Sequence, residues 1–321
     1  MPIHEIVLFW IVIFTIFLHV LIILIVFKKK KHNIYLKGSF FKLQGFKSII
    51  ELVMLLQFLF SMRLRKYGFL NFILIDRNWF WIHLPKITTI FHYYMKQEIY
   101  LCHIVLAANR FTAIQFPLRY DHFWSMKNLI ISMILVILLP LPYVLYLSID
   151  PNIHMNYMTS STGTIRLSYN NETTTITALM DGISCIFSGI LCIFIYIFII
   201  IAAIKIWNEQ KFFHTANYNN SQNNETTKIH VKLSFISGIL FTTLLLNSIC
   251  QSLTFYSQYE ENDYLTMKLN DISYPIVDCL YCSGPYILLL TTKDLRTEIL
   301  KSTRKEVKLV SVFKITKSSI L

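Results

Sequence analysis

Seven long apolar blocks divide the sequence, and they constrain the fold more than any other feature. A helix needs about 20 apolar residues to cross the roughly 30 Å hydrocarbon core of a bilayer. The chain is 55% hydrophobic and only 15% charged, whereas soluble domains carry about 25% charged residues. The sequence therefore predicts an all-α membrane protein, a seven-transmembrane helix bundle. The predicted spans are residues 6–27, 40–62, 87–112, 129–147, 179–204, 231–255 and 272–292.

Two of these spans are weaker than the rest. Spans 40–62 and 87–112 both contain charged residues. If span 40–62 did not cross the membrane, six spans would remain and the C-terminus would change sides. With seven spans, residues 1–292 form one bundle domain and residues 293–321 form a basic tail.

The distribution of Lys and Arg predicts which side of the membrane each loop faces, because cytoplasmic loops carry an excess of these residues. With the N-terminus outside, twenty Lys and Arg fall in inner segments and six in outer segments. We therefore expect an outer N-terminus and a cytoplasmic C-terminus. Asn171, in the outer loop 149–178, is a candidate for glycosylation. The outer segment 63–84 is an exception, with the basic residues Arg63, Arg65, Lys66 and Arg77.

Composition also bounds the partners and cofactors. The net charge of +12 comes from basic residues that flank apolar blocks, where they face lipid headgroups. Nucleic acid is therefore not an expected partner, and the lipid membrane is. The six cysteines all lie in apolar blocks, and only Cys279 and Cys282 are close in sequence. In an apolar helix this spacing favours packing over metal binding, so we expect no metal and no cofactor.

An arginine lies at the end of the third block, in the stretch LAANRFTAIQFPLRYDHFW (106–124). Arg110 falls at the cytoplasmic end of the span, where a long cationic side chain can reach the interface and contact a partner between the helices. Pro117 then ends the helix because it has no backbone N–H to donate. The stretch predicts an inner contact surface that includes Asn109, Arg110, Phe111 and Pro117.

This stretch resembles the third-span arginine motif of rhodopsin-like receptors, with Asn109 in place of the usual acid. It is more similar to the N-R-F-(T/S)-A-I-x-F-P pattern of the nematode serpentine chemoreceptors of the gamma superfamily (Srg-like, with class v as one candidate subclass). Three further stretches are similar, namely SFFKLQGFKSIIEL, LPKITTIFHYYMKQEIY and SGPYILLLTTKDLR. The last contains Gly284 and Pro285, which stand for the span-seven proline motif.

The resemblance implies a multi-pass chemosensory G-protein-coupled receptor in the plasma membrane, with sensory cilia as one location. Its implied partners are a small-molecule ligand and a heterotrimeric G protein, which would contact Asn109, Arg110, Phe111 and Pro117. Three departures separate the chain from rhodopsin-like receptors. The Asn-Pro-x-x-Tyr motif of span seven appears only as Gly284-Pro285 with Leu288. Asn109 cannot form an acid–arginine lock, and Pro85 stands about where those receptors have the cysteine that tethers the second outer loop.

Charged residues at membrane depth are costly and are read by default as functional. They are Glu51, Lys96, Glu98, Asp181 and Asp278. Helical spacing on the third and seventh spans then defines a candidate ligand pocket. Its residues are Lys96, Tyr100, His103, Tyr274, Asp278 and Tyr281.

Depth suggests a contact between the two spans of this pocket. At 1.5 Å per residue, Lys96 lies about 21 Å from Arg110, and Asp278 lies about 22 Å from Lys293. The similar heights lead to the hypothesis that Lys96 and Asp278 pair across the bundle and form the floor of the pocket. The alternative is that Lys96 bonds Glu98 or a backbone carbonyl.

Three functions fit these features to different degrees. The favoured one is a chemosensory receptor that detects a small extracellular ligand and signals to a G protein. The main rival is a small transporter or ion channel, in which Glu51, Lys96 and Asp278 would line an ion path. A seven-span protein without a ligand is the third. No catalytic constellation is visible, so an enzyme is not expected.

Overall fold

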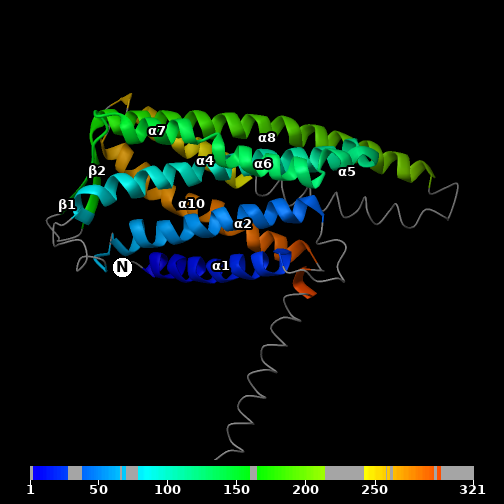
Figure 1. Cartoon of the computed structure of the whole chain (residues 1–321), viewed down its shortest axis with the longest axis horizontal. Helices are drawn as coiled ribbons and strands as arrows, with labels where there is room; N and C mark the ends of the chain where they lie inside the picture. The colour runs from blue at the N-terminus through cyan, green and yellow to red at the C-terminus, as the bar shows by residue number, and fades with distance from the viewer. Residues whose placement is uncertain are drawn as a thin grey trace, which may run out of the picture.

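The protein is described by a computed structural model that covers residues 3–27, 38–65, 67–69, 79–159, 165–213, 242–257, 259–260, 263–292 and 295–297. In this part of the chain, long helices lie along a common axis and alternate in direction (Figure 1). A two-stranded sheet lies at one end of the bundle. We call that end the hairpin end, and the opposite end, where the third predicted span finishes, the Arg110 end.

The described elements follow one another in a simple order. The long helices are α1 (Ile3–Phe27), α2 (Ser39–Phe58) with the π-helix η2 (Leu59–Leu64), α4 (Trp79–Gln115), α6 (Met126–Leu138) with α7 (Leu141–Ile149), α8 (Asn171–Phe213), a helix over 242–257, and α10 (Asp263–Thr291). Short elements between them are η3 (Pro117–Arg119), α5 (Tyr120–Phe123), β1 (Met155–Thr159) and β2 (Ile165–Tyr169).

The prediction of an all-helical membrane protein is confirmed. Among the described residues, the helices long and apolar enough to cross a bilayer are Ile6–Phe27, Ser39–Leu64, Met126–Ile149 and Glu172–Ala202. Trp81–Gln115 also qualifies when joined to Pro117–Phe123 across a bend of 116°, and Pro275–Leu290 is a shorter apolar helix.

Other parts of the topology stay predictions. The first part of the sixth predicted span, 231–255, lies outside the described residues. Most of the predicted tail, 293–321, lies outside them as well. Which end of the bundle faces the cytoplasm also remains a prediction. The direction of the described helices is compatible with it, because α1 begins at the hairpin end and α10 finishes at the Arg110 end (Figure 1).

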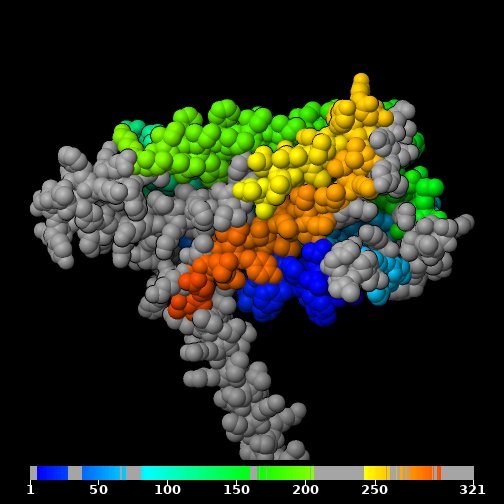
Figure 2. Space-filling view, turned by 180° about the vertical axis from the view of Figure 1, so that it is seen from behind, coloured from blue at the N-terminus to red at the C-terminus, as the bar shows by residue number. Residues whose placement is uncertain are grey.

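The surface of the bundle is apolar, as lipid requires. Phe187, Phe194 and Ile200 on α8 are each more than half exposed, and so are Trp10 and Phe14 on α1. Water would disfavour so large an apolar surface, whereas acyl chains are its natural environment. Figure 2 shows the face on which α10 and the helix 242–257 lie between α8 and α1.

Helix α4 is central to the packing, and it contacts α2, α6, α7 and α8. It extends beyond the predicted span 87–112 at both ends, and Pro85 is tolerated within its first turns. The Thr88 hydroxyl donates to the carbonyl of Leu84, the residue before this proline, at 2.7 Å. Pro140, in contrast, separates α6 from α7 within the fourth predicted span.

The β-hairpin is an element that the span analysis did not predict. β1 and β2 pair antiparallel, with Met155 opposite Tyr169 and Thr159 opposite Ile165. Met155 and Tyr157 are buried while the residues between and after them are exposed. This alternation is typical of a strand with one covered face, and here it is the start of α4 that contacts β1.

Candidate functional site

Three ion pairs lie inside the described part of the bundle. Lys96 on α4 pairs with Asp181 on α8, and Arg63 on η2 pairs with Asp278 on α10. The third pair, Lys47 with Glu51 at 2.7 Å, joins successive turns of α2. All six side chains are 6% exposed or less. A buried charge is tolerated only when it is paired, so these pairs determine which helix faces meet.

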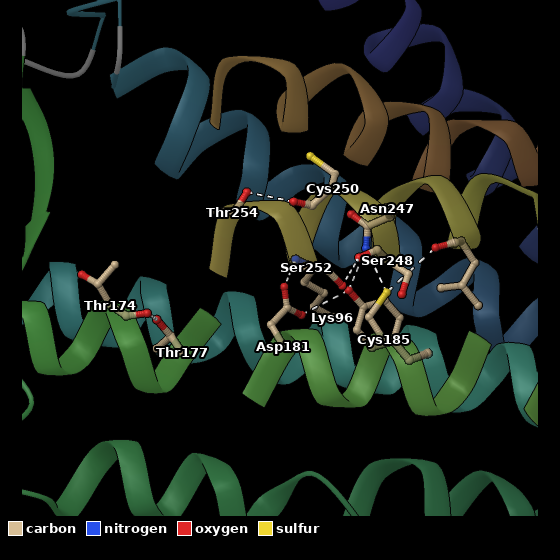
Figure 3. Close-up of polar contacts among 12 residues, drawn as sticks. Lys96, Thr174, Thr177, Asp181, Cys185, Asn247, Ser248, Cys250, Ser252 and Thr254 are labelled. Carbon is tan, nitrogen blue, oxygen red and sulfur yellow. Dashed lines mark hydrogen bonds and ion pairs between the residues drawn. The ribbon is translucent and has the colours of Figure 1, made fainter. Parts of the chain in front are cut away.

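The Lys96–Asp181 pair is the centre of a polar network (Figure 3). One carboxylate oxygen of Asp181 contacts Lys96, and the other accepts a hydrogen bond from the Tyr100 hydroxyl at 3.1 Å. That hydroxyl accepts in turn from the Asn247 amide at 2.9 Å. The network therefore joins α4, α8 and the helix 242–257, which are far apart in the sequence.

Two more side chains complete this network. The Asn247 amide also contacts the Cys185 sulfur at 3.4 Å. With its amide oxygen turned toward Lys96, Gln251 accepts from the lysine at 3.2 Å and donates to Asp181 at 3.2 Å. Orientation of an amide is assigned from its partners, and this one satisfies both groups. Both charges of the pair then have more than one polar neighbour.

The hypothesis that Lys96 pairs with Asp278 is wrong. Each residue has a different partner, Asp181 for Lys96 and Arg63 for Asp278. The depth argument estimated how far along its helix each residue lies, but it did not determine which way the side chain faces around that helix. It also compared two spans only, whereas the actual partners come from η2 and α8.

The hairpin end is held by Arg65, the residue that directly follows the π-helix. Its guanidinium donates to the carbonyl of Ser61 at 2.7 Å and to the carbonyl of Ile165 in β2 at 2.8 Å. It also lies over the ring of Tyr157 in β1, 5.5 Å from the centroid. Trp81 of α4 contacts the same ring edge to face, also at 5.5 Å. A buried arginine thus fastens the hairpin at the end where the sequence lacks the cysteine tether.

We expect Arg65→Gln to loosen the hairpin. The substitution removes the bond to the Ile165 carbonyl and the contact with Tyr157, and an unsatisfied buried acceptor costs about 1–3 kcal/mol. Amide hydrogen exchange over residues 155–169 should become faster. Lys86→Gln removes a positive charge from α4 at the same end and is the control. Equal exchange in the two variants would show that Arg65 does not hold the hairpin.

The Arg110 end contains a second polar network. The Asn109 amide donates to the Ser39 hydroxyl at 3.2 Å, and its oxygen accepts from the Tyr120 hydroxyl at 3.2 Å. Ser39 and Tyr120 contact each other at 2.6 Å. Asn109 therefore joins α4 to the start of α2 and to α5. Beside it, the Arg110 guanidinium lies 3.2 Å from the centroid of the Phe40 ring and is buried.

The segment after α4 presents an apolar surface at this end. The bend at Pro117 turns the chain back, and the Trp124 indole then donates to the Thr112 hydroxyl at 2.6 Å. Between these anchors, Leu118 is 100% exposed, and Phe116 and Phe123 are exposed as well. We call these three residues the loop patch.

Comparison with known proteins assigns the chain to a family. A family model described as "Srg family chemoreceptor" matches residues 6–299. The chain belongs to the Srg family. The resemblance inferred from residues 106–124 is thereby confirmed, and the protein is a membrane-embedded, multi-pass chemoreceptor. No curated protein matches it.

The structure brings only some of the predicted pocket residues of this Srg receptor together. Lys96 and Tyr100 share the central network, while Asp278 lies in the other ion pair. His103 and Tyr281 are buried but belong to neither pair. The side chain of Tyr274 lies outside the described residues, as does that of Asn171.

The predicted inner surface is also divided. Asn109 and Arg110 are buried, Phe111 is half-buried against Phe116 and Phe198, and Pro117 is exposed. Pro117, and in part Phe111, therefore offer surface to a partner in the conformation seen. The span-seven residues Gly284 and Pro285 are buried within α10.

Sequence reasoning missed several residues of the ion pairs and of the central network. Asp181 was visible as a charge at membrane depth, but nothing in the sequence linked it to Lys96. Arg63 was counted as a loop residue, although it lies in helix η2. Asn247 carried no signal, because a single asparagine in an apolar block has no spacing partner. Their roles depend on which faces of distant helices meet.

Proposed function

We propose that this Srg receptor binds a small-molecule ligand near the Lys96–Asp181 network and signals to a heterotrimeric G protein at the Arg110 end. Membership of a chemoreceptor family supports the sensory role. The observation that carries the coupling proposal is the loop patch, in which the fully exposed Leu118 lies just past the end of the helix that carries the buried Asn109 and Arg110. We further propose a plasma-membrane location, with sensory cilia as the site implied by resemblance.

The central network suits a ligand-sensitive switch. It joins three helices through Asp181, Tyr100 and Asn247, so a ligand that altered one contact would change how all three helices pack. A ligand shifts a conformational equilibrium only by its differential affinity for the two states. Buried charged contacts provide such a difference, since their strength depends steeply on distance.

The loop patch suits a protein partner. Exposed apolar side chains next to a polar rim mark interaction surfaces, and the bend at Pro117 keeps Leu118 clear of the bundle. Asn109 holds α5 through Tyr120, so a movement of α4 would be passed directly to the patch. Such coupling requires an element with two arrangements, and we assign that role to the α4–α5 bend.

A transporter or channel finds less support. Glu51, Lys96 and Asp278 were the residues that such a protein would use to line an ion path. Each of them pairs with an oppositely charged side chain in the bundle. Paired charges are suited to holding helices together.

We expect Leu118→Asp to abolish G-protein activation while leaving the receptor at the cell surface. A charge in the centre of an apolar contact must be desolvated without a partner, which is strongly unfavourable. The fully exposed position should tolerate the change in the free receptor. Cells carrying the receptor with promiscuous G proteins would be screened against a small-molecule panel, and surface tag staining would be measured in parallel.

Met158→Asp is the matched control. Met158 is also an exposed apolar residue, but it lies in β1 at the hairpin end, so the same substitution should leave coupling intact. Normal signalling by Leu118→Asp would disprove the assignment of the loop patch. Ligand-evoked currents that persist without any G protein would favour the channel alternative.

A further inference from the structure

A second buried polar cluster adjoins the Lys96–Asp181 network, because its member Tyr281 also interacts electrostatically with Asp181. It contains His19 of α1, Lys47 and Glu51 of α2, His103 of α4 and Tyr281 of α10, all 5% exposed or less. His19 interacts electrostatically with both Glu51 and Lys47, and His103 with Lys47. Tyr281 interacts with Asp181 and Cys185 of the central network as well as with Glu51. We call these five residues the four-helix cluster.

Most polar atoms of the four-helix cluster lack a protein hydrogen-bond partner among the described residues. They are His19 Nδ1, Lys47 Nζ, both carboxylate oxygens of Glu51, His103 Nε2 and the Tyr281 hydroxyl. The Lys47–Glu51 contact has the distance of an ion pair, 2.7 Å, but not the alignment of a hydrogen bond. The cluster therefore has unused donors and acceptors that come from four helices.

Unsatisfied groups at such depth need an explanation, because buried polar groups in proteins are nearly always hydrogen-bonded. In the described part of the chain, a contact with the backbone satisfies only one atom of the cluster, His19 Nε2, which lies 3.4 Å from the Tyr281 carbonyl oxygen. The residue next to the Glu51 carboxylate on α10 is Gly284, which has no side chain. A methyl group at Gly284 would be 3.5 Å from Glu51 Oε2 and 3.8 Å from Lys47 Nζ, in van der Waals contact with both.

The charges of the cluster select the ligand. Lys47 and Glu51 carry opposite charges that cancel, so neither a cation nor an anion gains net attraction. A metal ion would need several ligands close together, and the described residues contain no group of three or more His, Cys, Asp and Glu that could hold one. The remaining ligand must be small, neutral, and both a donor and an acceptor.

We propose that the four-helix cluster binds a small group of ordered water molecules that bridge α1, α2, α4 and α10. A buried water typically makes two to four hydrogen bonds to otherwise unsatisfied groups, and the cluster offers donors and acceptors of both kinds. Because Lys47 already neutralises Glu51, the cluster does not need a cation from solution. Water can exchange one partner for another, so these helices keep their polar contacts when they shift.

Radiolytic hydroxyl-radical footprinting of the full chain in lipid nanodiscs tests the proposal. X-rays generate radicals from bound water in place, so side chains beside it are oxidised even when they are buried. We expect His19 and His103 to be oxidised faster than Cys192. Cys192 is intrinsically more reactive but is 1% exposed in an apolar cluster. Oxidation of both histidines slower than that of Cys192 would show a dry cluster and overturn the proposal.

Cation dependence provides a second test. The melting temperature of the receptor should be the same in sodium chloride and in choline chloride at equal ionic strength. Lys47→Met leaves the Glu51 carboxylate without its partner, so this variant should become more stable in sodium than in choline. The double variant Lys47→Met/Glu51→Gln, which has no charge left, should lose that difference.

These outcomes separate the alternatives. A sodium-dependent melting temperature in the unmodified receptor would show a cation site and overturn the water proposal. If Lys47→Met fails to fold, footprinting of the unmodified receptor still decides between a hydrated and a dry cluster. Neither readout depends on a ligand or on a G protein, so the proposal can fail while the signalling function stands.

Discussion

Replacing Lys96 by methionine should remove most of the receptor from the cell surface and abolish its response. The substitution keeps the volume of the side chain but leaves Asp181 buried without its cation. Removing one partner of a buried ion pair costs about 3–5 kcal/mol, a large part of the 5–15 kcal/mol by which proteins are typically stable. Asp181→Leu should be as damaging, because it leaves Lys96 buried and unpaired.

A double variant shows whether the pair itself is responsible. Lys96→Met/Asp181→Leu contains no unpaired charge, so it should recover surface expression and thermal stability relative to either single variant. Lys96→Met/Asp278→Leu should recover neither, since it leaves both Asp181 and Arg63 unpaired. Surface staining and the melting temperature of purified receptor provide the two measurements.

Signalling would then be measured on the variant that recovers. If the pair is a switch as well as a support, Lys96→Met/Asp181→Leu should reach the surface but respond weakly to ligand. A full response would limit the pair to a structural role. Rescue of Lys96→Met by Asp278→Leu would instead support the pairing inferred from depth and contradict the structure.

Much of the fold could be predicted from hydropathy. An apolar block of about 20 residues leaves a backbone in lipid little choice but a helix, because every N–H and C=O must be satisfied within the segment. The helices therefore appear where the blocks predict them, although α4 and α8 run beyond their predicted spans at both ends. The hairpin escaped prediction because its five-residue strands carry too weak an alternation to stand out.

The sequence of residues 106–124 was enough to predict the family, but not the contacts that these residues make. Residues 106–124 identified the family, since the spacing of Asn109, Arg110 and Pro117 is a local feature of the sequence. The partners of Asn109 are Ser39, 70 residues earlier, and Tyr120, 11 residues later. The substitution of asparagine for an acid thus has a structural consequence, because an amide can both donate to Ser39 and accept from Tyr120.

The pairing of charges could not be predicted, because it depends on rotation around helix axes. Lys96 lies on α4 and Asp278 on α10, and each pairs with a residue on another element. A difference of one residue rotates a side chain by about 100°, as 3.6 residues complete a turn. Estimates of span boundaries are uncertain by more than one residue, so depth alone cannot choose among five membrane charges.

The basic segment 63–84 was the exception to the predicted orientation, and the structure gives two of its arginines other roles. Arg63 and Arg65 lie at the end of the second span, where one pairs with Asp278 and the other holds the hairpin. Lys66 lies outside the described residues, as does the Arg77 region. An arginine that is needed for a tertiary contact can be kept on either side of the membrane, so its presence argues little about orientation.

Arg63→Met should therefore destabilise the receptor without reversing its orientation in the membrane. Asp278 would remain buried without its cation, at a cost of about 3–5 kcal/mol, and the melting temperature should fall accordingly. Arg63→Met/Asp278→Leu should recover most of the loss.

Epitope tags at the two ends, stained before and after permeabilisation, should give the same pattern in every variant. Lys86→Met, which removes a basic residue of α4 near the same end, is the control for charge alone. Should Arg63→Met expose the C-terminal tag on intact cells, the arginine acts as an insertion signal, and its pairing with Asp278 would be secondary.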